Sequence, residues 1–236
     1  MFAAWMGTAG RGAAGQGLAW QGLARQGEAR QPLTKGRKMK VESDFTSKKI
    51  VNRTVRLVGM TDIMFDRYAG DNKTKLEPWQ KLYFAPGSKN IALPSLNLMS
   101  FLSAQNTNSA PKRLLPAKEY RKTANGFLSF VSIAQMYIPF LRDGQPIEFG
   151  EFEDDKDKKS GVYVHRAVAR LKDGIPNPKE RPVLPTPWAL EFGLSIYPNK
   201  EFQEQQLINI FEGGGVALGL GTFRGVFGKF SIERWD

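Results

Sequence analysis

A glycine-rich segment near the C-terminus carries the residues best suited to binding an anion. Seven of the sixteen residues from 213 to 228 are glycine, and Gly219, Gly221 and Gly225 surround one arginine, Arg224, with Lys229 close behind. Glycine lets backbone amides approach a ligand closely. A guanidinium pairs with phosphate through several N–H donors in a fixed geometry. This composition predicts either a phosphate-binding loop or a loop that packs tightly against its own fold.

The spacing of these glycines does not match the common nucleotide-binding loops. A dinucleotide fingerprint needs G-x-G-x-x-G between a strand and a helix, whereas this segment reads G-x-G-x-x-x-G and leads from a predicted helix into a predicted strand. A P-loop needs Gly-Lys-Ser/Thr before a helix, but here Lys229 is followed by phenylalanine and a predicted strand. We therefore expect no cofactor.

Two interpretations of the segment remain open. In the first, exposed amides and Arg224 bind the backbone phosphates of a nucleic acid. In the second, the glycines only allow a helix to cross closely over a sheet, and Phe223, Phe227 and Phe230 fill the core. The sequence alone does not decide between them, although a long cation has little use in packing.

Few side chains fit a catalytic role. His165 is the only histidine, and it alternates with Val162 and Val164 in a strand-like run, so we expect it to face away from them. A serine hydrolase would need G-x-S-x-G, which is absent from the sequence. The acidic residues at 154, 155 and 157 lie among lysines without the glycine of a calcium loop, so we expect a solvated loop and no metal site.

The charge of the chain favours an acidic partner. Its formal net charge is +11, of which residues 1–38 contribute +5. The remaining +6 is moderate for a nucleic-acid-binding domain. Basic residues interleaved with aromatic ones suit single-stranded binding, through phosphate contacts and base stacking. Beside Arg224 and Lys229, the candidate cations are Lys112, Arg113, Arg121, Lys122, Arg166 and Arg170, and for each of them the alternative is a solubilising surface charge.

Composition also excludes several classes of protein. The sequence has no cysteine, which rules out disulfides, thiol catalysis and cysteine-ligated metals and is compatible with a cytoplasmic protein. It has no apolar run long enough for a transmembrane helix. The first residues lack the apolar core of a signal peptide. We therefore expect no contact with membranes.

The chain divides into a tail and one domain. Residues 17–31 repeat every five residues as GLAWQ-GLARQ-GEARQ, a period that fits neither helix nor strand. With few aliphatic residues to form a core, residues 1–38 are predicted to be a low-complexity or disordered basic Gly/Arg tail. Translation from an upstream start codon is one explanation of the repeat, and Met39 would then be the native start. Residues 39–236 are predicted to form the domain.

The pattern of the domain predicts strands at 49–60, 91–93, 162–171, 188–197 and 229–234. One helix is predicted after Pro94-Ser95, and a second is predicted from Asn199 to its end at Gly213. Residues 126–140 have strand propensity, whereas 148–159 and the five-proline segment 176–187 are predicted to be loops. This order favours an α+β fold, compatible with a ferredoxin-like (RRM-like) antiparallel sheet with two helices and inserted loops.

Two motifs resemble the RAMP superfamily, the RRM-like backbone and processing subunits of CRISPR ribonucleoprotein complexes. The segment LGLGTFRGVFGKF, residues 218–230, is similar to the family's C-terminal glycine-rich loop, and IALPSL, residues 91–96, is similar to the start of its first helix. Asn97 and Leu98 replace the lysine and glycine expected next. The C-terminal segment is also similar to uncharacterised phage and prophage proteins.

The resemblance implies a non-catalytic, sequence-tolerant binder of single-stranded nucleic acid, RNA in preference to DNA. It also implies self-association or other complex subunits as partners, as in a ribonucleoprotein filament, with the loops 150–160 and 176–187 gripping a strand or a neighbour. Some family members cleave RNA with a loop aspartate, so Asp62, Asp66 and His165 are candidates if the chain is instead a RAMP-type ribonuclease. A phage structural or assembly protein is the third alternative.

Overall fold

The computed structural model describes residues 49–236 except 72, 106, 154–155 and 171–175. The predicted tail, residues 1–38, lies outside the described residues, as do Asp154 and Asp155 and the side chain of Arg170. Residues Ser43–Asp236 form one compact unit. The described part is a mixed α/β structure with antiparallel sheets and four α-helices.

The central sheet runs in the order β12-β1-β11-β5-β3, and every neighbouring pair is antiparallel. Its strands are β1 (Val51–Gly59), β3 (Ala92–Pro94), β5 (Tyr137–Arg142), β11 (Ala189–Ile196) and β12 (Phe230–Trp235). Two short strands extend it: β4 (Val131–Ile133) pairs with β11, and β6 (Gln145–Pro146) pairs with β5. The strand predicted at 49–60 is confirmed as β1, in which Val55 and Leu57 are fully buried on one face.

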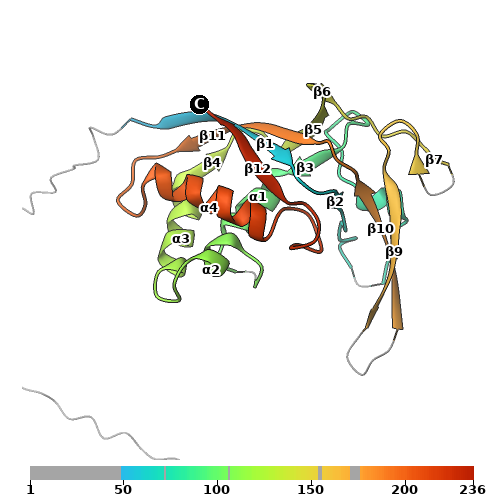
Figure 1. Cartoon of the computed structure of the whole chain (residues 1–236), viewed down its shortest axis with the longest axis horizontal. Helices are drawn as coiled ribbons and strands as arrows, with labels where there is room; N and C mark the ends of the chain where they lie inside the picture. The colour runs from blue at the N-terminus through green and yellow to red at the C-terminus, as the bar shows by residue number, and fades with distance from the viewer. Residues whose placement is uncertain (1–48, 72, 106, 154–155, 171–175) are drawn as a thin grey trace, which may run out of the picture. The chain divides into compact units, whose positions relative to one another are not determined.

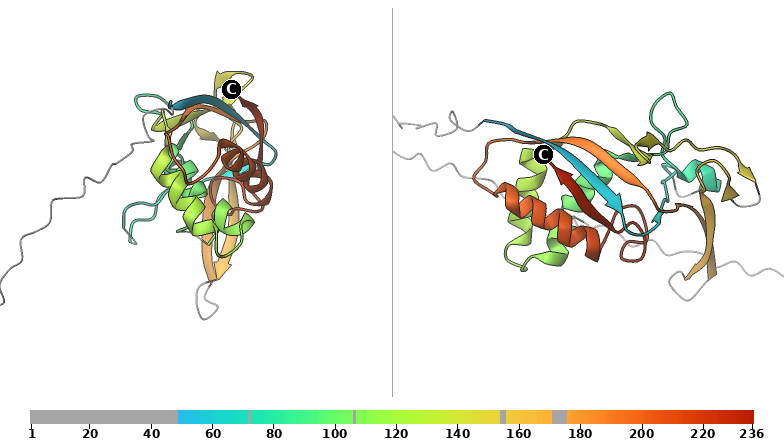
Figure 2. Two further views of the ribbon diagram at one scale, coloured as in Figure 1. Left: turned by 90° about the vertical axis from the view of Figure 1, so that its left-hand side faces the viewer. Right: turned by 45° about the horizontal axis from the view of Figure 1, so that its top comes forward.

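All four helices cover the same face of this sheet (Figures 1 and 2). Three lie between β3 and β4: α1 (Ser95–Leu102), α2 (Ala110–Leu114) and α3 (Tyr120–Phe130). The fourth, α4 (Glu204–Ala217), connects β11 to β12. Phe101 of α1, Phe211 of α4 and Phe230 of β12 form a ring cluster with centroids 5.7–6.5 Å apart, which holds the helices on the sheet.

The prediction of strand through 126–140 was wrong at its start. Residues up to Phe130 belong to α3, and the strands β4 and β5 begin only afterwards. Ala124 and Phe127 are buried on one side of the helix, and the Phe127 ring packs edge-on against Phe202 at 4.7 Å. This tertiary contact outweighs the weak strand propensity of the segment.

A second antiparallel sheet is ordered β2-β10-β9-β8-β7 (Figure 1), and its strands β7 to β10 lie between β6 and β11 in the chain, whereas β2 follows β1. Its strands are β2 (Ile63–Met64), β7 (Phe152–Glu153), β8 (Lys156–Asp157), β9 (Tyr163–Arg170) and β10 (Pro176–Leu184). A short 3₁₀ helix, η2 (Pro78–Lys81), packs against β10. The predicted strand at 162–171 is confirmed as β9, which forms a long ribbon with β10.

The prediction that the proline-rich segment is a loop was wrong, because most of it forms β10. Pro176, Pro178 and Pro182 have the same parity along the strand, so their nitrogens face the same edge. The carbonyl of Pro182 accepts a hydrogen bond from Phe65 on the β2 side, which places that edge away from β9. Proline is tolerated where the strand needs no donor.

The second predicted helix was placed too early. Helix α4 begins at Glu204 after the cap residue Gln203, and the Asn199 side chain instead accepts hydrogen bonds from the amides of Glu201 and Phe202. The helix also continues through the three glycines at 213–215. A β-carbon at Gly214 would lie 2.5 Å from the Phe101 ring, so glycine is required there by helix packing and not by a helix end.

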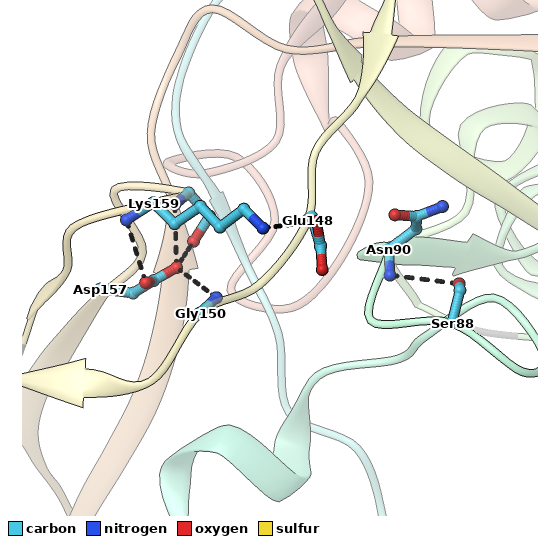
Figure 3. Close-up of polar contacts among 7 residues, drawn as sticks. Ser88, Asn90, Glu148, Gly150, Asp157 and Lys159 are labelled. Carbon is cyan, nitrogen blue, oxygen red and sulfur yellow. Dashed lines mark hydrogen bonds and ion pairs between the residues drawn. The ribbon is translucent and has the colours of Figure 1, made fainter.

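The segment 148–159 is more ordered than the loop expected there, because it contains β7 and β8 around a buried carboxylate (Figure 3). Asp157 is 1% exposed and accepts hydrogen bonds from the amides of Gly150 (3.1 Å), Lys159 (3.1 Å) and Ser160 (2.9 Å). These hydrogen bonds, with that of the Ser160 hydroxyl, hold the pKa of Asp157 below its usual value although its burial acts in the opposite direction.

Candidate nucleic-acid interface

The glycine-rich loop, residues 218–229, connects α4 to β12 and requires glycine for conformational reasons. Gly219, Gly221, Gly225 and Gly228 all have φ between +74° and +93°. The loop is closed by hydrogen bonds from the Leu220 amide to the Gly228 carbonyl (2.9 Å) and from the Gly225 amide to the Leu218 carbonyl (2.6 Å). The packing function considered from the sequence therefore accounts for these glycines.

The loop is also attached to the chain that follows β1. The Gly228 amide donates to the Asp62 carbonyl (2.7 Å), and the Thr222 amide donates to the Met64 carbonyl (2.9 Å). The Gly219 amide donates to the Gly214 carbonyl (3.0 Å) at the end of α4. Many loop amides are thus occupied by protein acceptors, so side chains must carry most of any ligand contact.

Arg224 is half-buried and joins the loop to the segment before α2. Its guanidinium donates to the carbonyl oxygens of Gly221 (3.3 Å) and Asn108 (2.7 Å). Among the described residues, no carboxylate lies within ion-pair distance of it. Burial lowers the pKa of Arg224, the sign expected for a cation that has lost water without gaining a counter-ion.

Arg224 lines an open recess of about 510 Å³. Its other lining residues are Thr107, Asn108, Gly221, Thr222 and Phe223. A smaller recess of about 160 Å³ also includes Gly221 and Thr222, and it continues to Asp66, Tyr83 and Asn97. The two recesses have Gly221 and Thr222 in common, and they are together called the groove below.

Phe223 is the feature that the sequence prediction missed. Phe230 is fully buried as expected, but the Phe223 side chain is 59% exposed. Its φ is +54°, a conformation that costs a bulky residue about 1–3 kcal/mol. The ring lies 6.1 Å from that of Phe227, which in turn lies 5.6 Å from His165 of β9. The nearest signal in the sequence is the density of glycine around an aromatic residue.

The carboxylates considered for catalysis make structural hydrogen bonds. Asp62 accepts hydrogen bonds from the Tyr163 hydroxyl and the Thr186 amide, both at 3.0 Å. Burial and this contact raise the pKa of Tyr163 to about 12. Asp66 pairs with Arg181 at 2.7 Å and lies 4.0 Å from the Lys81 ammonium, whose pKa is lowered by burial.

His165 does face away from Val164, as expected from the alternation, and packs its half-buried ring on Phe227. Within the described part of the chain, it forms no hydrogen bond with Asp62 or Asp66. No group of three or more metal-ligating side chains occurs among these residues either. The geometry thus does not assemble an acid–base pair or a metal centre from the candidates.

The remaining cations are dispersed over the fold. Lys112 and Arg113 are exposed on α2, which begins two residues after Asn108 and so borders the groove. Arg121 and Lys122 are exposed on α3, where Lys122 lies 3.6 Å from Glu201. Arg166 pairs with Glu180 at 3.1 Å and, as the neighbour of His165 in β9, lies on the opposite face of that strand. Lys229 is half-buried at the base of the loop, where its amide donates to the Thr61 hydroxyl.

A third recess, of about 470 Å³, lies away from these cations. It is lined by Trp79, Phe84, Ser88, Lys89, Phe149, Gly150 and Glu151. Hydrogen bonds to Asp157 hold Gly150 at its wall, and Ser88 accepts a hydrogen bond from the Asn90 amide (Figure 3). Its aromatic lining was not predicted from the sequence, because these residues are far apart in the chain.

No family model matches the sequence, and no curated protein matches it. One similar solved structure is a chain of a type III-B Cmr-beta complex bound to cognate target RNA, with a TM-score of 0.44 and 12% identity. The match covers 80% of this chain and 60% of that one, so this chain spans about three-fifths of its length. Among the described residues, no helix is long and apolar enough to cross a membrane.

Proposed function

We propose that this protein is a non-catalytic, sequence-tolerant binder of single-stranded nucleic acid, RNA in preference to DNA. The observation that carries the proposal is Arg224, a half-buried guanidinium without a carboxylate partner in the described residues, at the wall of an open recess. A buried cation without a counter-ion is unfavourable. A backbone phosphate in the recess would supply the missing charge and accept the guanidinium hydrogens.

We further propose that the central sheet is a ferredoxin-like core of the RAMP type. The strands β12, β1, β11 and β5 lie in this antiparallel order, and helical connections lead from β3 to β4 and from β11 to β12. The ribbon β9–β10 then extends from the core beside the groove and is suited to contact a bound strand or a second subunit. A filament of such subunits along one strand is the assembly that this arrangement favours.

The direct test is substitution of Arg224 by Gln. Glutamine removes the charge but retains a donor for the Asn108 carbonyl, so it should preserve the fold better than alanine. We expect weaker binding of a labelled uridine oligonucleotide and a log K versus log salt slope that falls by about 0.7, the value for one phosphate that is no longer bound. Fluorescence anisotropy over a salt series measures both quantities.

Arg234 provides a matched control, because it is an exposed arginine that pairs with Glu191 and Asp236 on the edge strand β12. Arg234→Gln removes the same charge and should leave the affinity within a factor of about 2. Equal affinities of the Arg224→Gln variant and the unmodified chain, with unchanged melting temperatures, would remove the basis of the proposal. A purified chain with no co-purified nucleic acid and no oligonucleotide binding would instead favour a structural or assembly protein with acidic partners.

A further inference from the structure

Without a ligand, Phe223 would destabilise the folded state in two ways. It leaves a large apolar surface in water, at 59% exposure. It also holds a bulky residue at φ +54°, a conformation in which glycine would be free of strain. Four glycines of the same loop have left-handed φ values, so the sequence supplies glycine at other such positions and phenylalanine at this one. Strain of this kind points to a ligand contact.

The surroundings of Phe223 indicate what that ligand is. Phe223 and Arg224 are consecutive, and both line the recess of about 510 Å³, together with Thr107 and Asn108. This volume is in the range of small-ligand sites and admits one nucleotide. An aromatic ring next to a cation offers one surface for a base and one for its phosphate, which are the two contacts that single-strand binders combine.

A series of rings continues from Phe223 toward the β9–β10 ribbon. Phe227 is tilted 44° to Phe223 at 6.1 Å, and His165 meets Phe227 edge-on at 5.6 Å. Phe227 and His165 are half-buried, so they support the exposed ring from behind. The Phe223 ring is therefore held in place by contacts that reach β9 as well as by its own loop.

We propose that this recess is a base-stacking subsite in which the Phe223 ring stacks on one base of a single strand while Arg224 pairs with an adjoining phosphate. The inference rests on the proposed nucleic-acid binding. Stacking requires only the π-face that every base possesses, so the subsite adds affinity without adding sequence preference. A polar recess beside a cation favours this ligand over the apolar side chain of a partner protein.

The test compares two ligands of equal length, a uridine 20-mer and an abasic 20-mer with the same phosphates. We expect the unmodified chain to bind the uridine strand about 5- to 100-fold more tightly. Phe223→Gly and Phe223→Leu should bind the uridine strand as weakly as the abasic one, whereas Phe223→Tyr should retain the difference. Quenching of 2-aminopurine placed in the strand reports the stacking itself, and only Phe and Tyr at this position should produce it.

Stability separates a ligand contact from a structural role. Phe223→Gly relieves a left-handed φ, so its melting temperature should be unchanged or higher while its affinity falls. Val226→Gly is the control, because Val226 is equally exposed on the same loop but has no ring, and it should leave the preference for uridine intact.

Two results would overturn the inference in distinguishable ways. Equal binding of uridine and abasic strands by the unmodified chain, with Arg224→Gln still weakening both, would refute base stacking and leave phosphate binding intact. Failure of the unmodified chain to bind either strand would refute both proposals. A lower melting temperature in Phe223→Gly with unchanged uridine affinity would show that the ring only packs.

Discussion

The carboxylate of Asp62 accepts hydrogen bonds from the Tyr163 hydroxyl and the Thr186 amide, while its carbonyl accepts one from the glycine-rich loop. One residue thus connects the end of β1 with β9, with the turn before β11 and with the loop. From the sequence, Asp62 was a candidate catalytic residue only under the alternative that the chain is a ribonuclease. Only the tertiary partners show that its hydrogen-bonding capacity is used by the fold.

Replacing Asp62 by Asn should change the titration of Tyr163. Burial and the carboxylate raise the pKa of Tyr163 to about 12, so removal of the negative charge should bring it closer to the ordinary value of about 10. Because the folded-state pKa is the higher one, the burial of Tyr163 and its contact with Asp62 favour the fold fully below about pH 10, and this contribution is lost as pH rises through about 12.

Ultraviolet absorbance titration of tyrosinate measures the change, and Tyr163→Phe identifies the signal of this residue. The substitution should also lower the free energy of unfolding at pH 7 by about 1–3 kcal/mol, the usual effect of losing a charged hydrogen-bond partner. A tyrosine titration that is the same in the Asn variant and the unmodified chain would contradict the assigned contact.

At the scale of elements, the three glycines at the end of α4, residues 213–215, differ in how closely other parts of the fold approach them. A β-carbon at Gly215 would lie 2.5 Å from the backbone carbonyl of Phe230, which cannot move aside without disturbing β12. At Gly213, the nearest atom is a side-chain carbon of Leu114, at 3.1 Å. The same substitution at positions two residues apart should therefore have different effects.

We expect Gly215→Ala to destabilise the protein by about 1–3 kcal/mol through overpacking between α4 and β12. Gly213→Ala should be neutral or stabilising by up to about 1 kcal/mol, since alanine is the better helix former and the Leu114 side chain can adjust. Urea denaturation of both variants measures the difference. Equal free energies of unfolding would argue against the close approach of α4 to β12.

Strict alternation of apolar residues made several strands predictable, whereas the proline and glycine content led to wrong predictions for β10 and for the end of α4. β1, β9 and β11 were predicted because apolar residues alternate along them, and α1 was predicted from its Pro-Ser start. The strand β10 was missed because proline fits a strand only along an edge that needs no N–H donor. The sequence does not show that β10 has such an edge. The last turn of α4 was missed because glycine usually ends a helix, and only contacts with Phe101 and Phe230 explain it here.

The candidate site was predictable from the sequence only in part. Arg224 was identified as an unusual cation in a glycine-rich segment, and it lines a recess. Its role in binding stays a prediction. The exposure of Phe223 depends on its positive φ, which no periodicity reveals. The placement of Arg166 on the far side of β9 depends on the pairing of that ribbon, which the sequence does not specify.

At the scale of the whole molecule, the contribution of the charged N-terminal segment can be tested apart from that of the domain. Residues 1–38 contribute +5 of the net +11. We predict that deleting them leaves the melting temperature unchanged, because Ser43–Asp236 is a compact unit of its own. If the tail binds nucleic acid, the salt slope of binding should fall by about 0.7 for each phosphate that the shortened chain no longer neutralises. Calorimetry and anisotropy of the two chains give both results, and a truncated chain that melts earlier would refute the predicted boundary.

The prolines of β10 have a consequence for how the molecule behaves in a crowded solution. On the edge of β10 away from β9, positions 176 and 178 present carbonyl oxygens but no N–H groups, while the Pro182 carbonyl is already occupied by the Phe65 amide. A foreign strand that approached this edge would find acceptors without the donors it needs for a regular ladder. The long ribbon can therefore remain extended in solution while resisting edge-to-edge aggregation with its own copies.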